Sequence, residues 1–313
     1  RVTGAGLRCL REASYPSQRA PSLPAMVHTF LRHGRERPAT FAVGVAGPVI
    51  AGHSQLTNLP WAVDEAELSA AFGFQRTRVL NDLEATGWAI GSLRGKQLAS
   101  LTPAPRARPG NAAIIAAGTG LGMAILVRDG GRWLVLASEG GHQEFAPRDS
   151  TEEALLRFVR RELGGRVSVE RLVSGDGLAR IYRFLTRTGR AREGAAMRRR
   201  VETASDPNAT ISEAGLAGRD RASARALALF VQLYGAAAGN LALVARATGG
   251  MFLAGGIAPR ILPALRAGAF LRAFRDKGRL SPLLAAIPIK VVLEPRAALL
   301  GAAACAADLR RVP

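Results

Sequence analysis

The sequence predicts an α/β protein with two domains, and three observations lead to this expectation. Apolar, strand-like runs alternate along the chain with helical patterns. The 313 residues, 48% of them hydrophobic, are enough to fill two cores. The proline-rich segment Thr102–Pro109 indicates a linker. We therefore expect a small α/β domain over residues 1–107, completed by a C-terminal helix at 295–313, and a large α/β domain over 108–294, with a cleft between them.

In the first half, a polar pair stands at the end of a predicted strand. The patterns predict strands at Leu7–Ala13, Thr40–Ala46, Val49–Leu56 and Arg76–Leu80, and helices after Pro21–Pro24, after Asp64 and at Leu83–Ile90. Asn81 and Asp82 follow the strand that ends at Leu80. Ligands of open α/β sheets gather at the carboxyl ends of strands, so this pair is a candidate site. The alternative is that Asp82 only caps the next helix, which would contribute about 1 kcal/mol.

In the second half, one long apolar segment needs a membrane check. The patterns predict strands at Ala112–Ala117, Met123–Val127, Trp133–Ala137, Met251–Ala254 and Ile289–Leu293, and helices from Ser150, at Leu178–Leu185, in pieces over Pro259–Phe274, and at Ala297–Leu309. Ala226–Ala245 has no charged residue and could span a bilayer by length. It contains Gln232 and Asn240 and is rich in alanine, which favours a buried central helix with close packing. We expect a cytoplasmic protein without a membrane span.

Charge and cysteine usage exclude several classes of function. The net charge is +19, and arginine supplies nearly all of the basic residues, scattered along the chain. This indicates a compositional bias toward arginine rather than a nucleic-acid surface. The densest arginine run lies in Thr186–Asn208, which we expect to be a mobile loop. Cys9 and Cys305 stand far apart without a metal-binding spacing, so neither a cysteine zinc site nor a disulfide framework is expected.

Two glycine turns are candidates for holding a phosphate. Gly118-Thr119-Gly120-Leu121-Gly122 separates two predicted strands, and glycines let backbone N–H groups approach an anion. The turn has no Walker A lysine and no following helix, so neither a P-loop nor a Rossmann fingerprint applies. An ordinary hairpin remains an alternative for this turn. Gly255-Gly256 follows another apolar strand, and the two turns together suit a nucleotide held by backbone N–H groups.

Polar side chains gather on a further glycine-rich turn. Glu139, His142 and Glu144 fall within six residues and could form part of a metal shell. No second histidine lies near them in the sequence, so hydrogen bonding to a hydroxylated ligand is the preferred interpretation, and no protein-bound metal is predicted. We expect Glu144 to be a solvated carboxylate.

Seven segments, in order along the chain, resemble the bacterial glucokinase family. They are Val43–Pro48, Thr57–Trp61, Leu80–Ala85, Ala117–Gly122, Glu139–Pro147, Ser168–Gly175 and Phe252–Ile257. Each segment is modest alone, but seven in the family's order are specific. The resemblance implies the two-domain, actin-like ATPase (ribonuclease H-like) fold of hexokinase-type sugar kinases, with an interdomain cleft. A related family of sugar kinases and repressors carries a cysteine-rich zinc motif, which is absent from this sequence.

The resemblance also implies an activity and a set of site residues. The activity is the kinase (transferase) reaction of glycolysis that converts glucose to glucose 6-phosphate with ATP and Mg²⁺. Asp82 would be the general base. Glucose would be bound by Asn58, Asn81, Asp82, Glu139, His142 and Glu170, and the nucleotide by Gly118, Thr119, Gly120, Gly122, Gly255 and Gly256. A homodimer is the family-based expectation. The residues themselves leave open which hexose is used, and whether the donor is ATP, polyphosphate or ADP.

One feature of the family has no match in this sequence. The family carries an N-terminal Asp-x-Gly-Gly-Thr phosphate loop, and nothing similar precedes Thr3-Gly4-Ala5-Gly6. We therefore expect an N-terminal truncation, weak Mg–ATP binding or poor folding for this span alone, and activity for the complete gene product. A non-catalytic sugar-binding regulator of the same fold is the alternative function. The presence of Asp82 favours the enzyme, because sugar binding alone requires no base.

Overall fold

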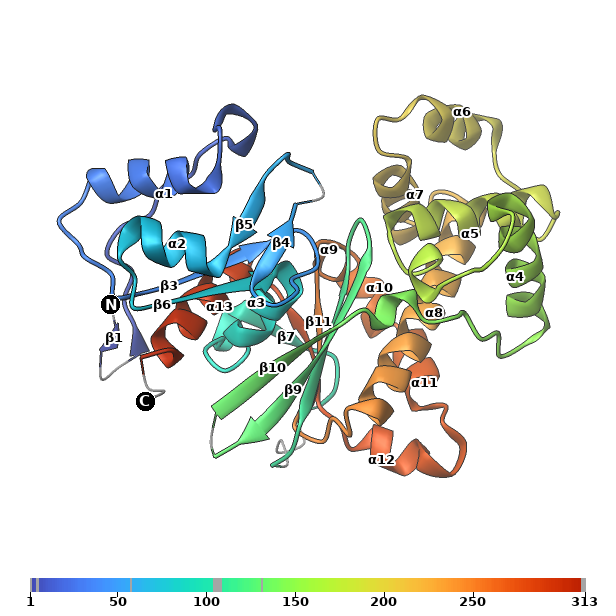
Figure 1. Ribbon diagram of the computed structural model, residues 1–313. Coiled ribbons are helices and arrows are strands. Elements are labelled where there is room, and N and C mark those ends of the chain that lie inside the picture. Colours follow the sequence, from blue (N-terminus) through green and yellow to red (C-terminus); the bar gives the residue numbers. More distant parts are fainter. Residues whose placement is uncertain (1, 4–5, 57, 104–108, 131, 311–313) are drawn as a thin grey trace. The chain divides into compact units, whose positions relative to one another are not determined.

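The structure is a computed structural model that describes residues 2–3, 6–56, 58–103, 109–130 and 132–310. It comprises two compact units, Arg1–Arg94 with Glu294–Pro313, and Gly95–Leu293 (Figure 1). Both units combine strands and helices. The predicted domain limits at residues 107 and 294 stay a prediction, and most of the proposed linker, 104–108, lies outside the described residues.

The first unit is organised around the parallel strands β3 (Thr40–Val45) and β6 (Arg76–Asn81). Helices α3 (Asp82–Ala89) and α13 (Ala297–Asp308) pack on each other and on β3. The other elements of this unit are β1 (Val2–Thr3), β2 (Gly6–Leu7), η1 (Ser17–Arg19), α1 (Leu23–Arg32), β4 (His53–Gln55), β5 (Ala62–Asp64) and α2 (Glu65–Phe72). The C-terminal helix therefore lies beside the helix that begins at Asp82.

Local signals in the sequence explain α2. Asp64 is its N-cap and accepts hydrogen bonds from the backbone N–H groups of Ala66 (2.8 Å) and Glu67 (3.0 Å). Gly73 ends the helix in the left-handed conformation, with φ of +67°. The helix start after Asp64 was expected from the sequence and is confirmed. Glycine ends the helix because it adopts the left-handed conformation without strain.

The strand predicted at Leu7–Ala13 is wrong. β2 ends at Leu7, and the following residues to Pro16 form neither helix nor strand. Side-chain contacts hold this segment instead, because the Arg11 guanidinium donates to the backbone oxygen of Phe30 (2.6 Å) and lies 4.0 Å from the centre of its ring. A cation over an aromatic face replaces the ladder that the apolar pattern suggested.

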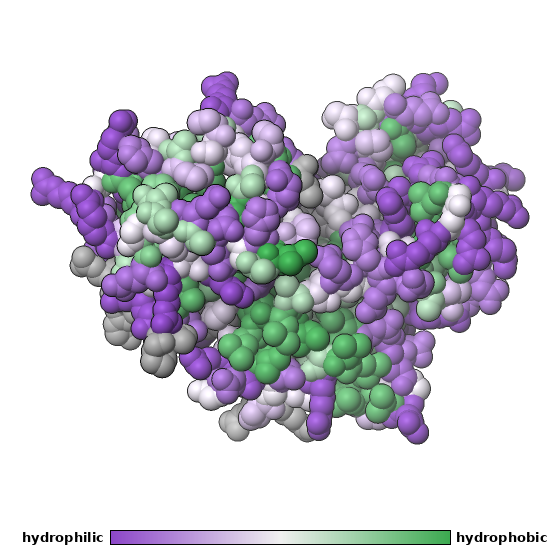
Figure 2. All heavy atoms as spheres, in the orientation of Figure 1, coloured by the Kyte–Doolittle hydropathy of each residue, from purple (hydrophilic) through white to green (hydrophobic). Residues whose placement is uncertain are grey.

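The second unit contains a six-stranded sheet in the order β10-β9-β8-β11-β12-β7. Its strands are β7 (Leu98–Ser100), β8 (Ala112–Ala117), β9 (Leu121–Asp129), β10 (Arg132–Ser138), β11 (Gly250–Ala254) and β12 (Ile289–Val292). β8, β11 and β12 are parallel neighbours, and the other pairs are antiparallel. Every residue of β11 is buried, as is usual for a central parallel strand. The edge strand β10 exposes Leu134 and Leu136, and apolar side chains gather over β9 and β10 in Figure 2.

Helix α8 (Arg221–Val244) is the central helix of this unit. Among the described residues it alone is long and apolar enough to cross a membrane, and 72% of its apolar window is buried. The predicted buried central helix is therefore confirmed. Tyr234 donates from its hydroxyl to the backbone oxygen of Ile115 in β8 (3.3 Å), and burial raises the pKa of that phenol. The α8 backbone also approaches α11 (Ala269–Arg275), because a Cβ on Gly235 would overlap the backbone oxygen of Phe270.

The segment Thr186–Asn208, predicted to be a mobile loop, contains helix α6 (Ala195–Thr203) and the start of α7 (Pro207–Leu216). Met197 of α6 is 5% exposed and packs into the large core. One buried anchor is enough here because alanine, arginine, methionine and glutamate are good helix formers. The remaining elements of the second unit are η2 (Gly95–Gln97), η3 (Gly140–His142), α4 (Ser150–Leu163), η4 (Val169–Arg171), α5 (Gly175–Arg187), α9 (Ile257–Arg260), α10 (Leu262–Arg266), η5 (Gly278–Leu280) and α12 (Ser281–Ala285).

The close packing of α8 on α11 gives a stability prediction. Gly235→Ala should lower the free energy of unfolding by about 1–3 kcal/mol, because the added methyl group meets backbone that cannot move aside as a side chain would. Gly165→Ala is the matched control, since a Cβ there meets nothing within 4 Å. Urea unfolding of both variants measures the difference, and equal stabilities would contradict the close packing of the two helices.

Candidate active site

The first glycine turn joins β8 to β9 and faces open space. Ala117 pairs with Leu121 across the turn, and Gly118 donates its N–H to the backbone oxygen of Gly120 (2.9 Å). A Cβ on Gly118 would meet no atom within 4 Å, and Thr119 is exposed. Gly122 lies further along, within β9, where it pairs with Ala116. The turn proper therefore comprises Gly118, Thr119 and Gly120.

The second glycine turn lies beside the first. β8 and β11 run parallel, with Ala254 opposite Ala116, so Gly255 follows its strand next to the first turn. Gly255 has a φ of +80°, and a Cβ there would overlap the backbone oxygen of Ala117. Gly256 is exposed, and a Cβ on it would meet nothing within 4 Å. The structure thus brings both predicted nucleotide turns to the same end of the sheet.

The turn that carries Glu139 and His142 packs against the start of β9. It contains the short helix η3, and both side chains are exposed. Gly141 is essential to this packing, because a Cβ there would overlap the backbone oxygen of Leu121. Ser138 supports the turn by accepting the N–H of Gly140 through its hydroxyl (3.0 Å). The first residue of β9 therefore fixes the distance between this turn and the first glycine turn.

Glu170 connects the two turns. It lies on η4, where its Oε2 accepts the backbone N–H of Leu121 (3.0 Å) and its Oε1 lies 3.8 Å from His142 Nδ1. A Cβ on Gly120 would come within 2.6 Å of the same Oε2. The Glu170 side chain is 24% exposed and that of His142 is 56% exposed, so both can still reach a ligand. A half-buried carboxylate beside a histidine and a glycine turn can accept hydrogen bonds from hydroxyl groups.

Glu144 has a different partner from its neighbours. Arg166 donates to its Oε1 (2.7 Å) and also to the backbone oxygen of His142. The hydrogen bond from Arg166 to the Glu144 carboxylate is the main reason that the pKa of Glu144 falls below its ordinary value, and the positive charge of Arg166 lowers this pKa further. The carboxylate is 76% exposed, so it belongs to a surface ion pair that braces the turn. Among the described residues, no group of three or more histidine, cysteine or acidic side chains could hold a metal ion.

In the first unit, Asn81 and Asp82 have different roles at the start of helix α3. Asn81 is the N-cap of α3, and its Oδ1 accepts the N–H of Glu84 (2.5 Å). Asp82 is exposed at the first helical position, and its Oδ1 accepts the N–H of Leu83 (2.8 Å). The interpretation of Asp82 as the helix cap is therefore wrong. Because Asn81 caps the helix, Asp82 keeps its second carboxylate oxygen for other chemistry.

Asn58, the remaining predicted sugar ligand, lies in the loop between β4 and β5. This loop is closed by the N–H of Leu56, which donates to the backbone oxygen of Trp61 (3.0 Å). Asn58 is exposed there, and Thr57 lies outside the described residues.

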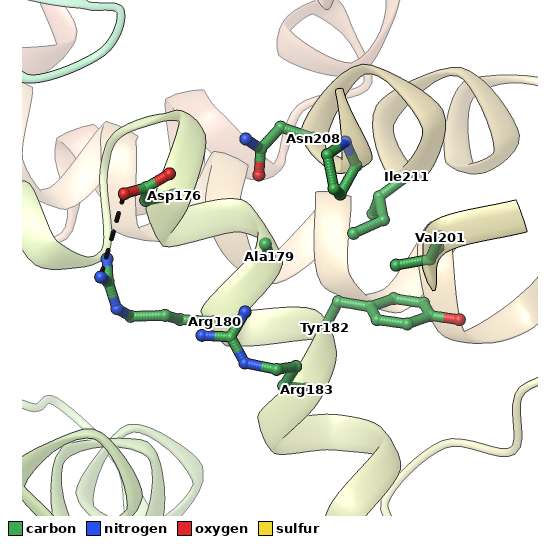
Figure 3. Close-up of a pocket in the computed structure, with 9 residues that line it drawn as sticks. Asp176, Ala179, Arg180, Tyr182, Arg183, Val201, Asn208 and Ile211 are labelled. Atoms are coloured by element: carbon green, nitrogen blue, oxygen red, sulfur yellow. Dashed lines mark ion pairs between the residues drawn. The ribbon is translucent and has the colours of Figure 1, made fainter. Parts of the chain in front are cut away.

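A pocket near the glycine turns was missed from the sequence. It measures about 410 Å³ and lies between α5, α6 and α7 (Figure 3). Its lining is Asp176, Ala179, Arg180, Tyr182, Arg183, Val201, Pro207, Asn208 and Ile211. Asn208 points into the space between α5 and α7, and its buried Oδ1 has no hydrogen-bond partner among the described residues. The pocket was missed because residues 186–208 were expected to be a loop.

The pocket connects to the first glycine turn through the start of α5. Gly175 donates its N–H to the backbone oxygen of Gly118 (2.9 Å), and a Cβ on Gly175 would lie 3.6 Å from Asn208 Nδ2. The glycine turn, the N-terminus of α5 and Asn208 are therefore consecutive neighbours. In the second unit, the open glycine turns, the His142–Glu170 pair and a pocket with both apolar and polar lining residues therefore lie close together.

Similar solved structures define the class of protein to which this chain belongs. The solved glucokinase from an Antarctic psychrotroph is 32% identical, with a TM-score of 0.82 over 94% of this chain and 88% of that one. A glucokinase of the ROK family from Streptomyces griseus, solved with glucose and AMPPNP, shares the fold at 20% identity, with a TM-score of 0.58 over 92% and 89%. The protein is therefore a sugar kinase of the actin-like ATPase fold, as the resemblance to glucokinases implied.

The family follows from the sequence matches. Residues 2–309 match the glucokinase family. The glucokinase of Nostoc sp. is 40% identical over 317 aligned residues, which cover 97% of this chain and 92% of that protein. This chain belongs to the glucokinase family.

Proposed function

We propose that this protein phosphorylates glucose on its 6-hydroxyl with ATP as donor. The observation that carries the proposal is the position of the Glu170 carboxylate, within hydrogen-bonding distance of the Leu121 N–H and 3.8 Å from His142. This position lets sugar-binding groups and a phosphate-binding turn share one support. Membership of the glucokinase family supports the choice of glucose, and the Streptomyces griseus relative solved with glucose and AMPPNP supports the pair of substrates.

Glucose recognition in this proposal rests on a mixture of donors and acceptors. Glu139 and Glu170 supply carboxylate oxygens that accept from sugar hydroxyls, and His142 can donate or accept. The Oδ1 of Asn81 is already occupied by the helix cap, so Asn81 would donate through its amide N–H groups to a sugar oxygen. Asn58 is a further candidate. A sugar that leaves such groups unpaired binds less well, which is the source of specificity.

Asp82 would act as the general base. A carboxylate suits this role because the hydroxyl proton needs to be taken only as the phosphoryl group is transferred. Asp82 is exposed, and its backbone is fixed at the junction of β6 and α3. Holding the base in position matters more than raising its basicity, since catalysis of phosphoryl transfer depends mostly on positioning and charge stabilisation.

The nucleotide would be held by the two glycine turns and the pocket beside them. Backbone N–H groups at Thr119, Gly120, Gly255 and Gly256 would surround the phosphates, while Gly118, whose N–H closes the turn, would let them approach; the open space above Gly118 and Gly256 fits this use. The unpartnered oxygen of Asn208 could accept from an amino or hydroxyl group of the nucleoside. Mg²⁺ would enter with ATP, because this ion is usually held by phosphates, water and one or two carboxylates rather than by a protein cage.

A variant of the base tests the chemistry. Asp82→Asn in the full-length protein should retain glucose binding and lose phosphorylation by about 10²–10⁴-fold, because the amide cannot take a proton. Asp276→Asn, an exposed carboxylate of the second unit, is the control. Calorimetry with glucose and a coupled assay for glucose 6-phosphate measure the two effects separately. Full turnover in Asp82→Asn would exclude Asp82 as the base, and a wild-type protein that binds glucose without turnover would favour the regulator.

A variant of the pocket tests the donor. Asn208→Ala should raise the KM for ATP about fivefold, which corresponds to the loss of one ordinary hydrogen bond. The KM for glucose should stay unchanged, because Asn208 would contact only the nucleoside. Asn240→Ala, on an exposed face of α8, is the matched control. Steady-state kinetics with each substrate varied in turn decides the question, and an unchanged KM for ATP would remove Asn208 from the nucleotide site.

A further inference from the structure

A short antiparallel bridge joins the segment that follows η3 to the segment that precedes η4. Its central pair is Glu144 and Ser168. Two backbone hydrogen bonds of 2.9 Å flank this pair, from the N–H of Phe145 to the oxygen of Val167 and from the N–H of Val169 to the oxygen of Gln143. Ser168 is 4% exposed, so the second segment of the bridge is anchored in the interior.

The register of this bridge places two of the proposed sugar ligands opposite each other. Two residues from the central pair, back along the first segment and forward along the second, stand His142 and Glu170. The distance of 3.8 Å between His142 Nδ1 and Glu170 Oε1 agrees with this register. It is longer than a hydrogen bond, so both atoms can still bind a ligand. A shift of one residue in the register would turn one of the two side chains to the opposite side.

The Arg166 side chain connects the two segments of the bridge. Its Nε donates to Glu144 Oε1 (2.7 Å), and its Nη2 donates to the backbone oxygen of His142. Both acceptors belong to the first segment and Arg166 to the second, so the two bonds oppose sliding of one segment past the other. The planar guanidinium presents its donors in a fixed fork, which the single nitrogen of a lysine does not provide.

Stability alone does not explain these contacts of Arg166. The side chains of Arg166 and Glu144 are 57% and 76% exposed, and exposed ion pairs contribute little to the free energy of unfolding. The bond to His142 differs, because its acceptor is a backbone oxygen, and it therefore restrains the peptide that carries the histidine side chain. The bridge is an isolated residue pair rather than part of a longer strand pairing, so a side chain that connects its segments can determine the register.

We propose that Arg166 is a positioning residue for glucose binding, which holds His142 opposite Glu170 by connecting the two segments of the bridge. This inference rests on the proposed role of His142 and Glu170 as ligands of glucose. Arg166 itself touches no substrate. It favours binding because the turn that carries His142 is ordered before the sugar arrives, and ordering it on binding would cost affinity.

Two variants of Arg166 in the full-length protein test the proposal, with calorimetry of glucose binding as the measurement. Arg166→Ala removes both donors and should raise the dissociation constant of glucose about 3–10-fold, because the turn must then be ordered on binding. Arg166→Lys keeps the positive charge but loses the fork, and it should raise this constant at least about threefold. Full glucose affinity in either variant would overturn the proposal, since the fork would then be dispensable.

Two controls limit the effect to the sugar. Arg157→Ala removes a similarly exposed ion pair, with Glu153 on α4, and should leave the dissociation constant of glucose unchanged. The KM for ATP should stay within about twofold of wild type in both Arg166 variants, because the bridge does not include the nucleotide turns. A loss of equal size for glucose and ATP would overturn the proposal, because it would indicate a general disturbance of the unit.

The coupling of Arg166 with His142 separates positioning from a purely structural role. In a His142→Ala background, Arg166→Ala should weaken glucose binding less than about twofold further, because the side chain to be positioned is gone. An equal loss in both backgrounds would overturn the proposal. If Arg166→Ala does not fold, Arg166→Lys in the same two backgrounds decides. If His142→Ala itself binds glucose as wild type does, the proposed glucose site fails, whatever the Arg166 variants do.

Discussion

The hydrogen bond from the Leu121 N–H to the Glu170 carboxylate is the constraint on which the site in the second unit depends. Leu121 is the first residue of β9, immediately after the glycine turn, and its backbone oxygen lies so close to Gly141 of the next turn that a side chain there would overlap it. One peptide position therefore sets the first glycine turn, the turn that carries Glu139 and His142, and the Glu170 carboxylate between them. A displacement of Leu121 would move all three together.

The first unit uses a comparable device at the carboxyl end of β6. There the side chain of Asn81 completes the hydrogen bonding of a helix start, and the adjacent Asp82 is left exposed. In both units a polar side chain satisfies a backbone N–H group next to a residue with a proposed role. This arrangement gives rigid backbone near exposed acids, which suits a reaction that depends on positioning.

Much of this fold could be predicted from the sequence, because its elements carry local signals. Asp64 and Gly73 mark the ends of α2, and the uncharged alanine-rich run predicted the buried helix α8. The buried strands β8 and β11 were also evident, since they are continuous apolar runs bounded by glycine. The close approach of His142 to Glu170 could not be predicted from spacing, because no spacing rule relates residues so far apart in the chain. Only the resemblance to glucokinases assigned both residues to one site.

What could not be predicted depends on tertiary contacts. Helix α6 was missed because its arginines suggested a loop, while one buried methionine, Met197, anchors it. Asn208 could not be recognised for the same reason, since its position depends on how α7 packs on α5. The sequence also could not show which of Asn81 and Asp82 is the N-cap of α3. Both residue types are good caps, and only the geometry of β6 and α3 selects Asn81.

A double-mutant cycle between His142→Ala and Glu170→Gln, with the dissociation constant of glucose as the readout, tests the central claim most directly. If the Glu170 carboxylate supports both the sugar and the turn that carries His142, the two losses of binding should be coupled by more than about 0.5 kcal/mol. Losses that add within that margin would mean that the two side chains act independently, which would contradict a shared support for the first glycine turn and the turn that carries His142.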